Sequence, residues 1–279
     1  MFSVLAKFGR VALVAVMAGT ALTLSGCGSD DVEEIEYIER PVELLYEDAL
    51  KFFRREDYRS AAPLFEEVER QHPYSVWARR AILMSAFCYY ELNKYSQVIL
   101  AADRFIALHP GNKDVAYAYY IKAVSYYEQI SDVGRDQKTT QQALVALNDV
   151  VQRFPNTAYA RDARLKIDLT LDHLAGKEMS VGRYYLKREQ YVAAINRFKA
   201  VLDAYQTTSQ VPEALHRLVE AYMALGIVPE AQKYAAVLGH NFPGSEWYEA
   251  TYALMTDANL APATEVDDDI LGDIWGFFF

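Results

Sequence analysis

The alternation of apolar and polar residues over 182–205 is the pattern that the rest of this chain repeats. In the second half of the stretch, apolar residues recur in steps of three and four, which places them on one side of a helix turning about 100° per residue. This stripe comprises Tyr191, Ala194, Ile195, Phe198, Val201, Leu202 and Tyr205. We expect a tight turn near 188–190 and therefore a pair of short helices. One such pair cannot bury both of its stripes alone, so it needs neighbours of the same kind.

The chain supplies these neighbours at a period of 37 residues, and the first repeat matches the stretch above at a constant offset of 133. Every repeat has an aromatic residue in its first helix. In four repeats a small residue precedes this aromatic residue by three positions, and in four a proline follows the second helix. The small residues are Ala49, Ala86, Ala123 and Gly182, the aromatic residues are Phe52, Tyr89, Tyr126, Tyr185 and Tyr222, and the prolines are Pro73, Pro110, Pro155 and Pro243. Proline disfavours helical geometry in the residue before it and so ends each pair.

These features resemble the tetratricopeptide repeat, a helix-turn-helix unit of about 34 residues. They predict an all-α solenoid of about five repeats and a capping helix near 246–256. The predicted repeats span 42–75, 76–112, 113–157, 158–208 and 209–245.

Two repeats depart from the pattern. The third carries eight additional residues, which we expect in a polar loop at 131–140. The fourth is preceded by 158–175, whose own apolar stripe contains Leu165, Leu169 and residues 171–174. We therefore predict one long helix over about 158–188. This helix would join the N-terminal repeats (42–157) to the C-terminal repeats and cap (158–256).

The N-terminus has the features of an export signal. Lys7 and Arg10 precede an apolar run over 11–24, which is shorter than the roughly 20 residues of a membrane-spanning helix. The run ends in Leu24-Ser25-Gly26-Cys27, which resembles the bacterial lipobox. We predict a lipoprotein signal peptide over 1–26 and a covalent lipid on Cys27; an ordinary signal peptide with a chance cysteine is the alternative. Gly28 is not the aspartate that holds some lipoproteins at the inner membrane, so the outer membrane is the expected destination.

An acidic stretch follows Cys27, and we interpret 27–41 as a tether to the folded body, which Pro41 opens. The whole chain has a net charge of −10, and its first 26 residues contain two basic residues and no acidic one. The remainder is thus still more acidic and matches a phosphate backbone poorly, which excludes nucleic acid as an expected partner. With Cys27 lipidated, only Cys88 remains, and we expect it to be buried.

No catalytic motif is present in the sequence. HExxH, P-loop, GxGxxG and G-x-S-x-G patterns are all missing. The five histidines are scattered or precede prolines at a helix end. We therefore expect no enzyme activity, no metal and no cofactor other than the lipid.

A binding groove is expected on the N-terminal repeats, because repeat solenoids bind through the concave face that their first helices line. In the tetratricopeptide repeat, the groove-facing positions lie three before, one after and four after the small residue. With Tyr117 a turn earlier and two flanking arginines, the predicted groove contains Tyr46, Leu50, Phe53, Arg54, Arg80, Leu83, Phe87, Tyr90, Tyr117, Tyr120, Val124 and Tyr127. So many aromatic residues favour an extended peptide with aromatic side chains, whose terminal carboxylate the arginines would meet. Packing of several of these residues against the tether or the next repeat is the alternative.

The lipobox, the acidic tether and the repeats together resemble the BamD family, lipoproteins of the machinery that assembles β-barrels in the bacterial outer membrane. The resemblance covers residues 24 to about 254 and is most specific at SVGRYYLKREQYVAAINRF over 180–198. It implies a receptor groove for unfolded outer-membrane proteins, a C-terminal half that docks on BamA, and other Bam lipoproteins as further partners. Within the INR tripeptide, Arg197 matches an arginine that contacts the last POTRA domain of BamA. On a helical wheel, Arg197 lies beside the apolar stripe and can face a partner.

Two other functions share parts of this pattern. A pilotin-like repeat lipoprotein that escorts secretin subunits would have the same anchor and fold, but would not be expected to carry the long helix followed by INR. An envelope enzyme with accessory repeats would need a second, non-repeat domain.

The segment 257–279 begins acidic and ends in Ile270–Phe279, which is rich in aromatic residues. It resembles the targeting signal of outer-membrane barrel proteins. One hypothesis is that this tail occupies the N-terminal groove as a self-inhibitor; loose docking on the last repeat or on the membrane is the alternative.

Overall fold

The computed structural model describes residues 39–260, and the predicted signal, Cys27 and the aromatic tail lie outside these residues. The compact unit that begins at Arg40 is built from α-helices alone within the described residues. The helices are α2 Val42–Phe53, α3 Tyr58–Gln71, α4 Val76–Glu91, α5 Tyr95–Leu108, α6 Val115–Tyr127, α7 Lys138–Arg153, α8 Ala158–Lys187, α9 Tyr191–Ala204, α10 Val211–Ala224, α11 Val228–Asn241 and α12 Glu246–Asp257.

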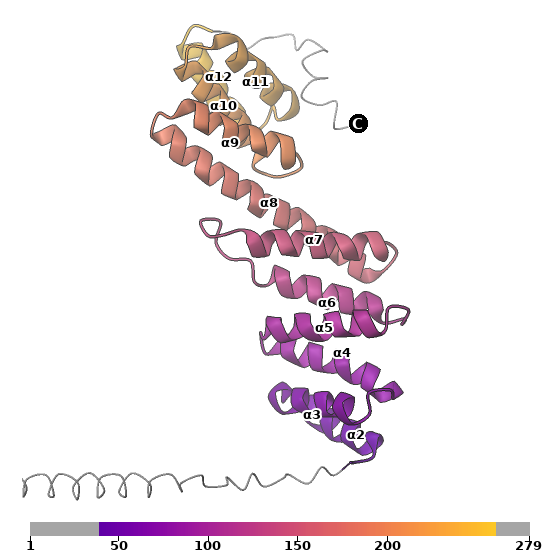
Figure 1. Ribbon diagram of the computed structural model, residues 1–279. Helices are drawn as coiled ribbons and strands as arrows, with labels where there is room; N and C mark the ends of the chain where they lie inside the picture. Colours follow the sequence, from indigo (N-terminus) through magenta and orange to yellow (C-terminus); the bar gives the residue numbers. More distant parts are fainter. Residues whose placement is uncertain (1–38, 261–279) are drawn as a thin grey trace, which may run out of the picture. The chain divides into compact units, whose positions relative to one another are not determined.

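The helices form five pairs in chain order, and α12 packs on α10 and α11 as a cap. Each helix packs against the one before it and the one after it, so that pairs stack on pairs (Figure 1). The first helices α2, α4, α6 and α8 also contact one another in sequence. The prediction of a tetratricopeptide-type solenoid is confirmed.

The turns between paired helices repeat with the same spacing as the sequence pattern. In four repeats, the turn contains a residue with a positive φ angle: Glu56 (59°), Asn93 (56°), Glu189 (59°) and Gly226 (72°). This left-handed geometry reverses the chain between helices. The third repeat has an insertion at this point and uses a longer connection.

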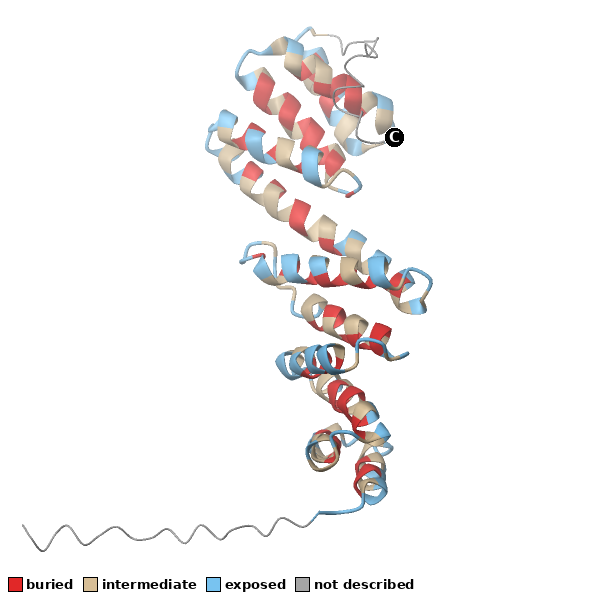
Figure 2. Cartoon of the chain, turned by 45° about the vertical axis from the view of Figure 1, so that its right-hand side comes forward, coloured by how far each residue is buried: buried red, intermediate tan, exposed pale blue. Residues whose placement is uncertain are grey.

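The core follows the stripe and the small residues. Ala49, Ala86 and Ala123 are fully buried, as are Ala194, Phe198 and Val201 of the opening stretch. Figure 2 shows the buried residues between the helices, with exposed residues on their outer surfaces. Small residues in first helices let the second helices approach closely, and the aromatic rings fill the space beside them.

The long helix α8 runs unbroken over Ala158–Lys187, which confirms the predicted joining helix. Its predicted stripe was wrong in part, because Leu165 and Leu169 are about two-thirds exposed, whereas Leu174 is buried. The first half of α8 packs on α7 through Ala160, Ala163 and Thr170 instead. Among the described helices, the partner that covers the second half of α8 is α9, which begins only at Tyr191, so the two leucines remain exposed.

The inserted loop at 131–140, predicted as a polar loop, also makes contacts with α8. The Lys177 ammonium group donates to the Gly134 carbonyl oxygen at 3.0 Å, and Val133 lies beside Gly176. The Gln137 side chain is buried and donates to the Arg135 carbonyl oxygen at 3.0 Å. The loop therefore braces the middle of α8 against the third repeat.

The exposure of Leu165 and Leu169 leads to a direct test of the corrected packing. Leu165→Glu and Leu169→Glu should each change the free energy of unfolding by less than about 0.5 kcal/mol, as substitutions at exposed sites do. Leu174→Glu places a carboxylate among buried residues and should destabilise the fold by several kcal/mol. Thermal melts of the three variants check this; comparable losses for all three would contradict it.

An aromatic hollow and an exposed arginine

The first helices of the N-terminal repeats line an open hollow of about 410 Å³, which we call the aromatic hollow. Side chains from α2, α4, α6 and the first turn of α8 line it, and they converge because these four helices contact one another in order. The lining residues are Tyr46, Phe53, Arg80, Leu83, Met84, Phe87, Asp114, Tyr117 and Tyr159. Six of these side chains belong to the groove predicted from the sequence: Tyr46, Phe53, Leu83 and Phe87 from the repeat spacing, Tyr117 one turn before it, and Arg80 as a flanking arginine.

Ring contacts hold the walls of the hollow in place. Tyr46 packs on Trp77 with ring centroids 4.8 Å apart, and Phe53 packs on Phe87 at 5.7 Å. On the other side, Tyr117 lies 5.8 Å from Tyr159. Tyr46 itself is almost fully buried by these contacts. A wall fixed in this way loses little conformational freedom when a ligand binds.

The hollow is uncharged except at its rim. Burial raises the pKa of Tyr46, against the opposite effect of the Arg80 guanidinium. Burial likewise raises the pKa of Tyr117. Both phenols are therefore protonated at neutral pH and can donate hydrogen bonds. Arg80, which lies over the Trp77 ring at 5.8 Å, and Asp114 provide one charge of each sign.

Six residues assigned to the groove do not line the hollow. Two of them pack in the interior: Val124 is buried, and Leu50 packs against the core of the first repeat. Tyr120 donates to the Asp162 carboxylate at 2.7 Å and packs on Tyr159 at 5.0 Å, so it continues the aromatic wall beyond the hollow. Tyr90 bonds to Glu128 at 3.4 Å, and Tyr127 lies beneath the Lys166 ammonium group. Arg54 is exposed at the far end of α2.

Met84, Asp114 and Tyr159 line the hollow but were not predicted from the repeat spacing. Tyr159 was not predicted as a groove residue because the small residue of the fourth repeat was assigned to Gly182, near the end of α8. The helix serves twice: its first turns complete the groove of the third repeat, and its last turns form the first helix of the fourth. The signal that could have identified Tyr159 is the fully buried small residue Ala163, which follows it by one turn.

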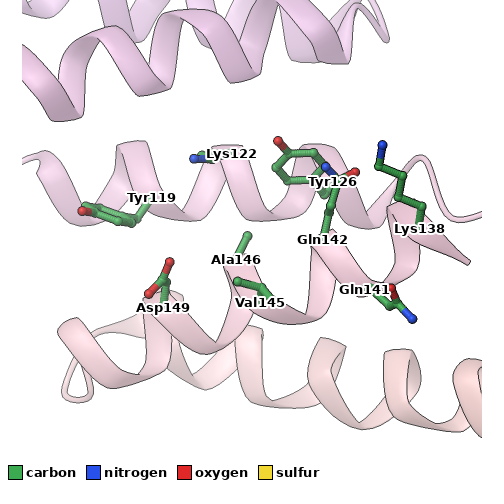
Figure 3. Close-up of a pocket in the computed structure, with 9 residues that line it drawn as sticks. All are labelled: Tyr119, Lys122, Tyr126, Lys138, Gln141, Gln142, Val145, Ala146 and Asp149. Atoms are coloured by element: carbon green, nitrogen blue, oxygen red, sulfur yellow. The ribbon is translucent and has the colours of Figure 1, made fainter.

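A second hollow of about 320 Å³ lies between α6 and α7, on the side away from α8 (Figure 3). Its lining is Tyr119, Lys122, Tyr126, Lys138, Gln141, Gln142, Val145, Ala146 and Asp149. Most of these side chains are long and polar, and Lys122 is already paired with Asp103 of α5 at 2.6 Å. The aromatic hollow is therefore the better candidate for an apolar ligand.

Arg197 lies on α9 and is exposed, as its position beside the stripe predicts. Its guanidinium Nη1 donates to the Glu178 carboxylate of α8 at 3.1 Å, and nearly half of the Arg197 side chain reaches solvent. An exposed ion pair contributes about 0–1 kcal/mol. Arg197 is thus largely dispensable for the fold. Glu178 lies 19 residues earlier on a different helix, and no pattern in the sequence predicted this pair.

Residues 39–260 contain no group of three His, Cys, Asp or Glu side chains that could hold a metal ion. Within the same residues, none of the helices has both the length and the apolar character needed to cross a bilayer.

Comparison with known proteins decides the family. The family YfiO, described as outer membrane lipoprotein, matches residues 39–238. The outer membrane protein assembly factor BamD of Caulobacter vibrioides is 54% identical over 258 residues, which cover 92% of this chain and 85% of that protein. The chain belongs to the BamD family. BamD of Rickettsia prowazekii is 45% identical over 87% of this chain and 96% of its own length, and BamD of Neisseria meningitidis serogroup A is 35% identical over 80% and 89%.

Solved structures resemble this BamD-family chain only loosely. A tetratricopeptide protein of Thermus thermophilus aligns over 77% of this chain and 99% of its own, with 20% identity and a TM-score of 0.36. The fold assignment therefore rests on the helix pairs and their turns. The family match spans α2 to α11, so it includes both the aromatic hollow and Arg197.

Proposed function

We propose that this chain is a non-enzymatic scaffold and receptor subunit of the machinery that assembles β-barrel proteins in the outer membrane. A lipid on Cys27 would hold it at the periplasmic face. The aromatic hollow would bind extended segments of unfolded barrel proteins, and the surface around Arg197 would dock on a POTRA domain of BamA, with other Bam lipoproteins attached. The observation that carries the proposal is the convergence of aromatic residues from three successive repeats on one preformed hollow.

The chemistry of the hollow suits an extended apolar segment. Strands of outer-membrane barrels alternate apolar and polar residues and have aromatic girdles at their ends. An aromatic side chain of such a strand can fill the hollow between Phe87 and Tyr117, while neutral phenols donate to its backbone carbonyl oxygens. Arg80 at the rim is placed to meet a carboxylate of the segment.

The surface around Arg197 suits a protein partner. The arginine is only half covered and bound to a single carboxylate. An exposed guanidinium is typical of interface anchors, because its planar fork can bind a carboxylate bidentately. A pilotin-like role shares the anchor and the fold, and the family match favours assembly of barrel proteins over it.

Filling the aromatic hollow tests the receptor role. Met84→Trp would direct an indole into the hollow from α4 and should weaken binding of a synthetic peptide from the last strand of a barrel protein by about tenfold or more, the effect of losing one buried aromatic anchor. Gln142→Trp, which fills the second hollow of Figure 3, is the matched control and should bind normally. Fluorescence anisotropy of the labelled peptide measures both; equal affinity of Met84→Trp and the unsubstituted chain would contradict the proposal.

A further inference from the structure

Exposed apolar side chains gather at one edge of the first two repeats. Over residues 40–114, five large apolar side chains are more than half exposed, and only Leu100 among them lies in the middle of a helix. The other four are at helix ends or in a connection: Leu44, Tyr74, Val76 and Leu108. Tyr74 is the extreme case, with 98% of its surface exposed.

Connectivity brings these four residues to the same edge. In a stack of antiparallel pairs, the start of each first helix and the end of each second helix lie at one side. Leu44 is in the first turn of α2, Tyr74 and Val76 are at the α3–α4 connection, and Leu108 ends α5. We call this side of the first two repeats the anchor edge.

The chain enters the fold at the anchor edge. The Arg40 backbone N–H donates to the Gln71 side-chain oxygen at 2.9 Å, and the His72 ring lies 2.7 Å from the Arg40 carbonyl oxygen. Both partners are at the end of α3, next to the connection that carries Tyr74. Arg40, the residue at which the predicted tether reaches the repeats, is thus held at the anchor edge. The 13 residues from Cys27 to Arg40 can span at most about 45 Å.

We infer that the anchor edge rests on the lipid surface, with Tyr74, Val76 and Leu108 inserted among the lipid headgroups. This inference rests on the proposed lipid anchor at Cys27. Single exposed apolar residues are ordinary on protein surfaces, but a cluster with a fully exposed tyrosine beside a membrane tether matches the amphipathic belt of proteins at membrane interfaces. A lipid anchor and a second apolar contact reinforce each other, because the tether raises the local concentration of the edge at the membrane.

The opposite edge of the same repeats has a different character. The turn between α2 and α3 consists of Arg54, Arg55, Glu56 and Asp57, all exposed. Glu91, Asn93 and Lys94 are exposed at the turn between α4 and α5. Within the described part of the first two repeats, the large apolar side chains that are exposed near helix ends lie at the anchor edge. This asymmetry orients the first two repeats relative to the membrane.

Site-directed fluorescence quenching tests the inference. Cys88 is fully buried, and burial raises the pKa of its thiol to about 12, so a thiol-reactive fluorophore will label an introduced cysteine selectively. The lipidated full chain is reconstituted into phosphatidylethanolamine–phosphatidylglycerol vesicles with nitroxide-labelled acyl chains. Fluorophores on Tyr74→Cys and Leu108→Cys should be quenched strongly, as expected at a depth of about 5–10 Å. A fluorophore on Arg55→Cys at the opposite edge is the matched control and should not be quenched.

A second variant tests whether the apolar side chains themselves contact the lipid or merely lie near it. The triple substitution Tyr74→Ser, Val76→Ser and Leu108→Ser should abolish quenching of a fluorophore on Lys113→Cys and leave the melting temperature unchanged, because these side chains are exposed. If chains that sediment with the vesicles show equally weak quenching of fluorophores at positions 74, 108 and 55, the inference is overturned. It is also overturned if the fluorophore at position 74 becomes shielded from solvent only after a protein partner is added. A chain that does not sediment with the vesicles would instead contradict the lipid anchor.

Discussion

Gly182→Ala is expected to lower the free energy of unfolding, while the same substitution at Gly176, less than two turns earlier in the same helix, raises it. A Cβ at position 182 would lie 2.8 Å from Cδ1 and Cζ of the Phe198 ring and closer still to Cε1. The ring is fully buried and cannot move aside. Overpacking of this kind costs about 1–3 kcal/mol, which exceeds the gain of about 1 kcal/mol from replacing a helical glycine.

Gly176 is the matched control because its surroundings leave room. A Cβ there would meet only the Val133 side chain, at an ordinary contact distance of 3.5 Å. Gly176→Ala should therefore stabilise the chain by up to about 1 kcal/mol through helix propensity. For a unit of this size, 1 kcal/mol corresponds to about 2–4 °C in melting temperature. Thermal melts should thus shift in opposite directions for the two variants.

The collision with the Phe198 ring, as the cause of the lost stability, can be tested separately. Adding Phe198→Leu to Gly182→Ala should recover part of the lost stability, because a smaller side chain relieves the collision. Phe198→Leu alone should destabilise the chain. If Gly182→Ala and Gly176→Ala raise the melting temperature equally, the close approach of α8 and α9 at this point is wrong.

Arg197→Glu is expected to reduce affinity for the BamA POTRA domain by about thirtyfold or more while leaving the melting temperature nearly unchanged. The pair with Glu178 is exposed and contributes no more than about 1 kcal/mol to folding. Loss of a charged anchor at the centre of an interface typically costs 2 kcal/mol or more, which is about thirtyfold in affinity. Co-purification and titration with an isolated POTRA domain measure the effect.

A charge exchange decides whether Arg197 acts directly. The double variant Glu178→Arg with Arg197→Glu rebuilds the internal ion pair but presents an acidic group on α9. Binding should stay lost if the arginine itself contacts the partner; recovery would show that it acts only by pairing with Glu178. Lys122→Glu, which breaks the exposed pair with Asp103, is the control and should bind normally. Recovery of a secretin in place of BamA would favour the pilotin-like alternative.

The sequence predicted the repeats well and their connections less well. Buried positions such as Ala86 and Phe198 follow from periodicity, since only one face of each helix can be covered by its neighbours. Leu165 and Leu169 satisfied the same periodicity but are exposed. A stripe identifies which residues share a face of a helix; it does not show whether another helix arrives to cover that face.

Some residues of the groove could likewise be predicted from the sequence, and others could not. Tyr46, Phe53 and Phe87 were identified because groove positions have a fixed offset from the small residue of each repeat. Tyr159 was not identified, because α8 contributes to two repeats at once, and a repeat count assigns it to only one. Asp114 was missed because it precedes α6 and lies outside the helical periodicity.

The sequence by itself determined the helix pairs, their period and the family to which the chain belongs, because these depend on local periodicity, turn residues and motif identity. Only the tertiary structure decided which aromatic residues meet in one hollow, that Arg197 is paired with Glu178, and that four apolar side chains share the edge where the tether enters. Each of these depends on contacts between residues far apart in the chain. Such contacts are set by how the pairs stack, and no single helix encodes that arrangement.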